Sequence, residues 1–321
     1  MSLHDYFYRR LDDIQKGAYT ALKSALLAHR KRITLNYFPN IHRALSALKH
    51  DCAAELYFVN WIGIENRLSF ISAKCKMVFT PTYLFSAEEI AVYGKRIDKL
   101  VKSFAKYKEA SVLCRKVHDW LSMNVMYDRD EIDKHLYRRN NHNIIGPLIE
   151  RKAVCEGISL AYQYILNRFG IDCMTVSGRV LKTEGQYYKE YHAWNVISLN
   201  KSNYHVDVTW DRPIDIFGKK HPAYGYYCMP SKLFRDHICA LFLKCESLEE
   251  NLFYKAKRLF SSAQQLRLFV SQRNPYNCCM IYISNLTNDE VANIIKKYSK
   301  YNYKIIRTTQ WRQSGMLLLL K

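Results

Sequence analysis

The residue best placed to do chemistry in this sequence is Cys155, because it lies at the predicted start of an amphipathic helix. Apolar side chains recur from Ile158 to Phe169 at the i, i+3, i+4, i+7 spacing of one buried helical face, and Gly170 marks the helix end. A thiol at a helix N-terminus faces unpaired N–H groups and the positive end of the helix dipole, and both favour the thiolate. The sequence therefore predicts a cysteine nucleophile. An inert, buried thiol is the ordinary alternative in a chain with ten cysteines.

Two runs downstream predict a β-hairpin that carries a histidine and an aspartate. Residues 191–197 and 204–210 are rich in aromatic and β-branched side chains, and the polar stretch 199–203 predicts a turn. With an even number of loop residues, even-numbered positions lie opposite odd-numbered ones, so His192 and Asp207 share a face, opposite each other or one pair apart. A carboxylate on the second ring nitrogen fixes the tautomer of a histidine base. With the upstream cysteine, this pair completes a candidate triad.

Three segments, AVCEGISLAYQYILNRFGIDCMTVSG, YHAWNVI and YHVDVTWD, resemble the catalytic blocks of the transglutaminase-like superfamily. The resemblance implies an α+β, papain-like core in which the nucleophile helix packs on an antiparallel sheet. It also implies that Cys155 is the nucleophile, His192 the general base and acid, and Asp207 the residue that orients the histidine. The resemblance is closer to the prokaryotic transglutaminase/protease-like members than to the calcium-dependent animal crosslinkers.

The implied activity is cysteine-dependent acyl transfer at a peptide or carboxamide bond. The Cys155 thiolate would attack the carbonyl, the Cys155 backbone N–H would help to bind the oxyanion, and His192 would protonate the leaving amine, which leaves a thioester. Water as acceptor gives hydrolysis by a peptidase or amidase, whereas an amine gives transamidation and protein crosslinking. Because no calcium-loop signature is present, we favour hydrolysis of a peptide or cell-wall peptide bond. Transamidation stays open as the alternative.

Cofactor and charge signals point to no further chemistry. The sequence predicts no cofactor and no metal site, since the ten cysteines lack a C-x-x-C pair or zinc-ligand spacing and are typical of reduced thiols. The formal net charge of +20 predicts attraction to anionic polymers, and no nucleic-acid-reading motif accompanies it. A catalytically silent scaffold or polyanion-binding module is therefore the alternative from another class. The intact set of candidate triad residues argues against it.

Three regions are predicted along the chain: an N-terminal mixed helix and strand region (1–105), a transglutaminase-like catalytic core (106–240) and a small C-terminal α/β module (245–321). In the first region we expect helices at 11–29, around 41–48 and at 86–105, and strands at 33–35, 55–62 and 76–79. Ser86 and Glu89 predict a capping box at the start of the third helix.

The core and the C-terminal module are expected to alternate helices with strands. In the core, periodicity predicts a helix at 110–123, a polar loop at 129–143, a closing strand at 224–228 and a helix at 231–237. In the module it predicts helices at 252–270 and 287–298 and strands at 280–284, 303–308 and 315–320.

The N-terminus and the hydropathy pattern carry the expectation about location. No apolar run approaches the roughly 20 residues that span a bilayer, and residues 1–5 lack a charged and then apolar signal region. We expect a cytoplasmic protein with no membrane span, although a chain trimmed of its secretion signal would begin in the same way. The expected partner is a protein or peptide substrate.

Overall fold

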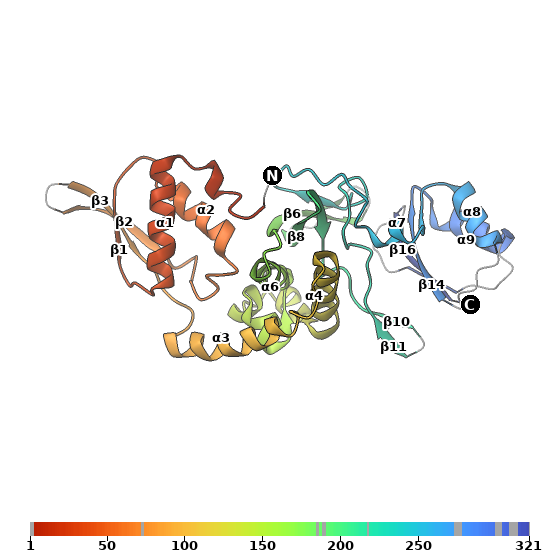
Figure 1. The fold of residues 1–321 in the computed structure, drawn as a ribbon, viewed down its shortest axis with the longest axis horizontal. Helices are drawn as coiled ribbons and strands as arrows, with labels where there is room; N and C mark the ends of the chain where they lie inside the picture. Colours follow the sequence, from red (N-terminus) through yellow and green to blue (C-terminus); the bar gives the residue numbers. More distant parts are fainter. Residues whose placement is uncertain are drawn as a thin grey trace. The chain divides into compact units, whose positions relative to one another are not determined.

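The chain divides into two compact units in the computed structural model, which describes residues 3–71, 74–183, 186–187, 191–216, 218–272, 278–298, 304–307 and 314–320. The first unit comprises Met1–Leu113 and Val125–Thr175, and the second comprises Cys114–Asn124 and Val176–Lys321. Both mix helices with mainly antiparallel sheets (Figure 1), which agrees with the predicted α+β class. Within the described residues, no helix has the length and apolarity that a membrane crossing requires. The predicted region boundaries near 105 and 245 stay predictions.

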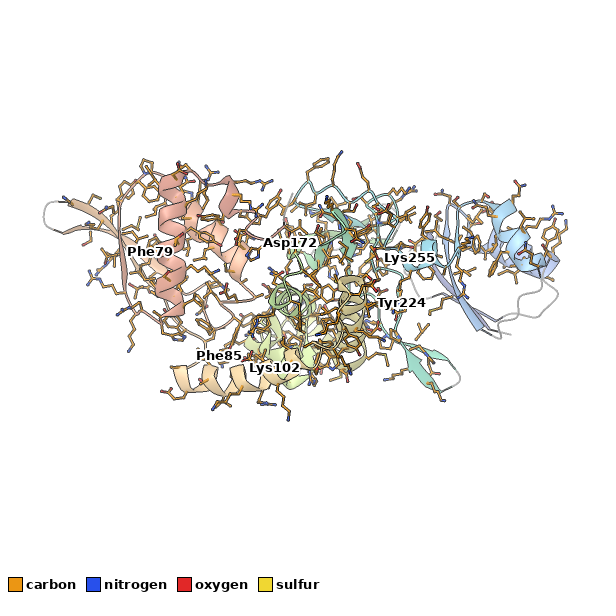
Figure 2. The ribbon with its side chains drawn as sticks, viewed as in Figure 1. Phe79, Phe85, Lys102, Asp172, Tyr224 and Lys255 are labelled. Carbon is orange, nitrogen blue, oxygen red and sulfur yellow. The ribbon has the colours of Figure 1, made fainter. Side chains whose placement is uncertain are left out.

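The first unit begins with two helices and a three-stranded antiparallel sheet. The short 3-10 helix η1 (Tyr8–Arg10) precedes α1 (Asp13–Leu27), which packs beside α2 (His42–Cys52), and the sheet has the order β1 (Ile33–Asn36), β3 (Lys74–Thr80), β2 (Glu65–Ile71) (Figure 1). Phe79, labelled in Figure 2, is a buried side chain of β3.

One strand prediction in this region is wrong. Residues 55–62 form turns with an isolated bridge at Val59, although Leu56, Phe58 and Val59 are buried. A short apolar run indicates that its side chains are buried but not that its backbone pairs with another strand, so the pattern could not separate a strand from a buried turn. The strand β2 was not predicted because its sequence is polar, although its backbone does pair with β3.

The rest of the first unit leads to the helix that starts at Cys155. Ser86 and Glu89 form the predicted capping box of α3 (Ala87–Lys102). The helix α4 (Ala110–Asn124) is divided between the units, because residues 110–113 belong to the first and residues 114–124 to the second. The following chain is built from short pieces: β4 (Met126–Tyr127) paired in parallel with β5 (Lys152–Ala153), α5 (Arg129–Asp133), the 3-10 turn η2 (Arg139–His142), the π-helical turn η3 (Gly146–Glu150) and α6 (Cys155–Arg168). The expected polar loop at 129–143 therefore contains two helical turns.

The second unit is organised around an antiparallel sheet of the order β12 (His237–Cys239), β6 (Cys173–Thr183), β8 (His192–Leu199), β9 (Ser202–Val206), with β7 (Gln186–Tyr187) paired to β6. Asn200 and Lys201 both have positive φ, so a two-residue turn joins β8 to β9. The second hairpin strand ends at Val206 and not at residue 210, since residues 207–211 turn back on themselves. A small hairpin, β10 (Ile214–Ile216) with β11 (Lys219–His221), follows.

Two predictions after this hairpin are wrong. In place of the closing strand predicted at 224–228, residues 225–228 form turns and bends. In place of the helix predicted at 231–237, residues 231–236 are mainly turns and His237 begins β12. One edge strand of the sheet is β12, which pairs with β6 so that Cys239 lies opposite Gly178. A Cβ on Gly178 would lie 2.0 Å from the carbonyl oxygen of Ile238, so glycine is required for this close approach.

The C-terminal part of the second unit has its own apolar core. Its sheet has the order β13 (Leu259–Phe260), β14 (Cys278–Ser284), β16 (Ser314–Leu320), β15 (Lys304–Arg307), and its helices are α7 (Leu252–Lys255), α8 (Ala263–Ser271) and α9 (Asn288–Tyr298). The predicted helix at 252–270 is broken by β13, whereas the helix predicted at 287–298 is present as α9 and is capped by Thr287 and Glu290. The ends of the strand predicted at 303–308 lie outside the described residues. The core side chains are Phe260, Leu266, Val270, Ile281, Ile283, Leu286, Val291 and Ile295.

Candidate active site

Cys155 is the first residue of α6, as the sequence predicts. Its N-cap residue, Val154, has extended backbone and makes no side-chain cap hydrogen bond. The Cys155 side chain is partly exposed, whereas the following face of α6 is buried. The eight cysteines whose side chains the structure describes are thiols.

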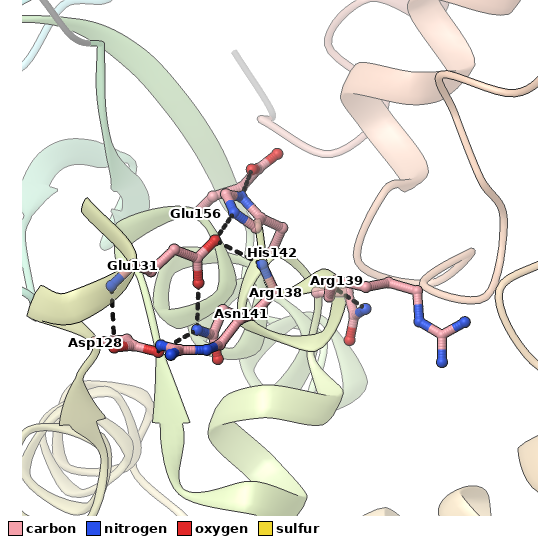
Figure 3. A network of polar contacts seen from close by, with 8 residues as sticks. Asp128, Glu131, Arg138, Arg139, Asn141, His142 and Glu156 are labelled. Atoms are coloured by element: carbon pink, nitrogen blue, oxygen red, sulfur yellow. Dashed lines mark hydrogen bonds and ion pairs between the residues drawn. The ribbon is translucent and has the colours of Figure 1, made fainter. Parts of the chain in front are cut away.

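A polar network ties the chain before α6 to the first turn of that helix (Figure 3). Asp128 pairs with Arg138 and with Lys152, and Asn141 donates to Asp128 at 2.8 Å and also to Glu131. Burial alone would raise the pKa of Asp128, and the hydrogen bonds from these neighbours hold it below its ordinary value. The network fixes the segment 128–143 and gives Asp128 a structural role.

His142 is the member of this network that reaches α6. Its Nδ1 lies 2.8 Å from Glu156, directly after Cys155, and its Nε2 lies 2.7 Å from the buried Glu131. Burial lowers the pKa of His142, but the hydrogen bonds to Glu156 and Glu131 outweigh it and leave the pKa above its ordinary value. The His142 side chain therefore joins η2 to the first turn of α6.

His192 and Asp207 form a buried pair in the second unit. The Nε2 atom of His192 lies 2.7 Å from Oδ2 of Asp207. Since β8 and β9 pair with Asn195 opposite Val206, the two residues project from one face just beyond the ladder. The predicted pairing of this histidine with this carboxylate is therefore present.

Asp207 is held by donors on both carboxylate oxygens. Its Oδ1 accepts the backbone N–H groups of Thr209 (2.9 Å) and Trp210 (3.2 Å), and its Oδ2 faces His192 and also His237 at 3.0 Å. Burial alone would raise the pKa of Asp207, and the two facing imidazoles hold it below its ordinary value. The residue is an ionised, fixed acceptor at neutral pH.

His237 and Asp236 are members of this cluster that the sequence reasoning missed, because it placed them in a helix. Nδ1 of His237 lies 2.8 Å from Asp236, whose other oxygen accepts the Tyr226 hydroxyl at 2.7 Å. A lone histidine in a three-residue edge strand leaves no periodic signal. The pairing of β12 with β6 is what brings it to Asp207.

The same cluster offers the one donor set for a metal ion that the described residues form. Nε2 of His192, Oδ2 of Asp207 and Nε2 of His237 lie within 4.8 Å of one another. Two imidazoles and a carboxylate are a donor set that zinc accepts. The distances of 2.7 and 3.0 Å from Oδ2 of Asp207 to the two ring nitrogens are those of hydrogen bonds. Hydrogen bonding to this carboxylate therefore accounts for the positions of both imidazole rings.

Aromatic side chains enclose the pair. Trp194 is fully buried and Trp210 is partly buried. His205 accepts the Trp194 indole N–H at 3.2 Å and lies 3.1 Å from Ser231. Burial, together with the neighbouring His237, lowers the pKa of His205 to about 3, so this ring is neutral. His205 therefore supports the aromatic side chains around the pair and does not act as a base.

The predicted site residues are divided between the two units. Cys155 belongs to the first, whereas His192 and Asp207 belong to the second. Cys155 begins α6 in the first unit, and His192 is paired with Asp207 in the second. The catalytic roles of the three residues stay predictions.

Comparison with known proteins gives a family match for the central segment of the chain. Residues 98–208 match the family model of the Transglutaminase-like superfamily. No curated protein is significantly similar to the chain. Among solved structures, a TGase is 17% identical with a TM-score of 0.33, over 56% of this chain and 51% of that one. The chain thus spans about half the length of this solved protein.

Two further solved structures are similar at lower identity. A candidate cysteine protease from Cytophaga hutchinsonii is 13% identical with a TM-score of 0.31, over 56% of this chain and 66% of that one. A candidate protease from Parabacteroides distasonis ATCC 8503 is 9% identical with a TM-score of 0.27, over 81% of this chain and 62% of that one. The match to the Transglutaminase-like superfamily model spans α4, α6 and the β8–β9 hairpin.

Proposed function

We propose that this protein is a cysteine-dependent acyl-transfer enzyme that acts on a peptide or carboxamide bond. The observation that carries the proposal is the buried pair of His192 and Asp207, with 2.7 Å between Nε2 and Oδ2, on a hairpin that the family match includes. A carboxylate in this position fixes the imidazole tautomer and stabilises the ring when it takes a proton. Cys155 at the start of α6 is the proposed nucleophile.

The proposed reaction uses three residues in separate roles. The hydrogen bond from Nε2 of His192 to Asp207 leaves Nδ1 as the atom that would exchange a proton with the Cys155 thiol. The thiolate would attack the substrate carbonyl, and the protonated His192 would deliver its proton to the leaving amine. The Cys155 backbone N–H would contribute to the oxyanion site. The chemistry requires Cys155 Sγ and His192 Nδ1 to come within hydrogen-bond distance.

Hydrolysis is the proposed outcome, with transamidation as the alternative from the same thioester. Both share the acylation step, and the acceptor decides the product. The proposed substrate is a protein or peptide, cell-wall peptides included, and the proposed location is the cytoplasm.

The protein would be incubated with two peptides, one that contains glutamine and internal backbone amides and a second that contains lysine. Mass spectrometry of the products then separates the two outcomes. Backbone cleavage or deamidation identifies hydrolysis, and a covalent adduct of the two peptides with loss of ammonia identifies transamidation. Cys155→Ser is expected to abolish either product, because a serine hydroxyl is a much weaker nucleophile than a thiolate in this setting. Persistent conversion by the Cys155→Ser protein would contradict the proposal.

A further inference from the structure

The orienting carboxylate of the proposed triad faces two imidazoles and not one. Oδ2 of Asp207 lies 2.7 Å from Nε2 of His192 and 3.0 Å from Nε2 of His237. His237 has a fully buried side chain and comes from a different strand, β12. An oxygen shared by two donors is more restricted in direction than an oxygen with one.

We infer that His237 is a positioning residue for the proposed reaction: it holds Oδ2 of Asp207 in the place from which that oxygen orients His192. This inference rests on the proposed function. His237 does not touch the reacting atoms in this account, and its effect passes through Asp207.

Both nitrogens of the His237 ring face carboxylates, and the ionised Asp207 can only accept the hydrogen bond from Nε2. Nδ1 faces the Asp236 carboxylate at 2.8 Å, and an ionised carboxylate has no proton to give. Asp236 is itself fixed, since it accepts the Tyr226 hydroxyl, and the backbone carbonyl of Tyr226 accepts the N–H of Asp207 at 3.0 Å. These hydrogen bonds link Asp207, His237, Asp236 and Tyr226 in a closed loop.

Packing leaves the His237 ring little freedom to turn. Phe234 stacks on it with ring centroids 4.0 Å apart, and Trp210 and Trp194 meet it edge-on at 4.6 and 4.9 Å. Its backbone is set by β12, whose approach to β6 depends on the absence of a side chain at Gly178. A positioning role requires an imidazole that is buried, hydrogen-bonded at both nitrogens and held in place by its packing neighbours.

Two isosteric substitutions separate the two sides of the ring. The amide nitrogen of His237→Gln can take the place of Nε2 and still donate to Asp207, whereas that of His237→Asn can take the place of Nδ1 and donate to Asp236 alone. The full-length parent and both variants would be alkylated with iodoacetamide at pH 6 and pH 10, and the rate at Cys155 followed by peptide mass spectrometry. Thermal melting of each protein reports its stability.

The inference predicts that Cys155 reacts at pH 6 about tenfold more slowly in His237→Asn than in the parent, as expected for loss of one hydrogen bond to a charged group, and nearly as fast as the parent in His237→Gln. At pH 10 the three rates should converge, because ordinary thiols are then ionised. If His237 were merely structural, the Cys155 alkylation rates of the two variants would follow their melting temperatures. The two variants would then not differ from each other at pH 6 while agreeing at pH 10.

Equal rates in a reactive parent and both variants, equal losses in both variants, or faster reaction in His237→Asn would overturn the role of His237 and leave the proposed function standing. A parent protein whose Cys155 reacts no faster at pH 6 than an ordinary thiol would overturn the proposed function, and this inference with it.

Discussion

Three histidines that the structure describes each lie between two carboxylates. They are His118, with Asp119 and Asp211; His142, with Glu131 and Glu156; and His237, with Asp207 and Asp236. At His118 and His142, whose pKa values lie above the ordinary value, the ring donates from both nitrogens, because an ionised carboxylate only accepts hydrogen bonds. The carboxylates raise the pKa of the buried His118 to about 9, although burial alone would lower it. Figure 2 labels Tyr224, whose ring stacks on His118.

The bridge made by His142 predicts a pH-dependent contribution to stability. The pKa of His142 in the fold is above the 6.5 of the unfolded chain, so its contribution is fully present below pH 6.5 and is lost as the pH rises through the folded value. His142→Ala should therefore lower the free energy of unfolding by about 1 kcal/mol at pH 6, with allowance for the partly exposed ring, and by less at pH 9. Urea unfolding at the two pH values measures this.

The exposed His221, in β11, offers a matched control for this measurement. His221→Ala should change the unfolding free energy little at either pH. A loss in His142→Ala that is the same at pH 6 and pH 9 would show that packing, and not the charged bridge, holds η2 to α6.

Among the elements, the contact between α6 and the segment before it depends on Gly157. A Cβ at this position would lie 2.2 Å from the backbone oxygen of Asn141 and 3.0 Å from that of Asn143. Backbone atoms cannot move aside as a flexible side chain does, so the first turn of α6 and η2 can meet only over a glycine.

Gly157→Ala should therefore destabilise the protein by about 1–3 kcal/mol, the usual effect of overpacking. At Gly17, within α1, an added Cβ would meet nothing within 4 Å beyond the backbone of its own helix, so Gly17→Ala should instead stabilise by about 0.5–1 kcal/mol through helix propensity. Denaturant midpoints of the two variants give the comparison. If both variants are stabilised, the predicted clash at α6 is wrong.

Elements with local signals could be predicted from the sequence. Ser86 and Glu89 mark the start of α3, and the apolar face and Gly170 mark α6, because caps and helical periodicity act within a few residues. The sequence could not predict the turn-rich segments 225–228 and 231–236 or the strand β12, because their conformation depends on partners distant in sequence. The candidate pair His192 and Asp207 was predictable from hairpin parity, and His237 was not.

For the whole molecule, the net charge of +20 is the property that no single element explains. Basic residues are spread along the whole chain. Such a surface attracts anionic polymers by a screened, sequence-independent interaction. It does not by itself identify a partner or a reaction.

The protein should bind a sulfated polysaccharide such as heparin at low salt, with affinity that falls by about tenfold or more between 50 and 200 mM salt. Cys155→Ala should bind as the parent does, because the charge is unchanged. Fluorescence anisotropy with a labelled oligosaccharide measures both. Absence of binding at 50 mM salt, or binding that salt does not weaken, would contradict the electrostatic interpretation.

The division of the proposed triad between two units makes the reactivity of Cys155 the central question for the whole molecule. The most direct measurement is the rate of alkylation of each of the ten cysteines against pH, located by peptide mass spectrometry, in the parent and in His192→Ala. The account predicts that Cys155 reacts far faster than the other thiols between pH 6 and 7 and loses this advantage in His192→Ala. A Cys155 that titrates like an ordinary thiol, with a pKa of about 8.5, or that keeps its reactivity without His192, would contradict it.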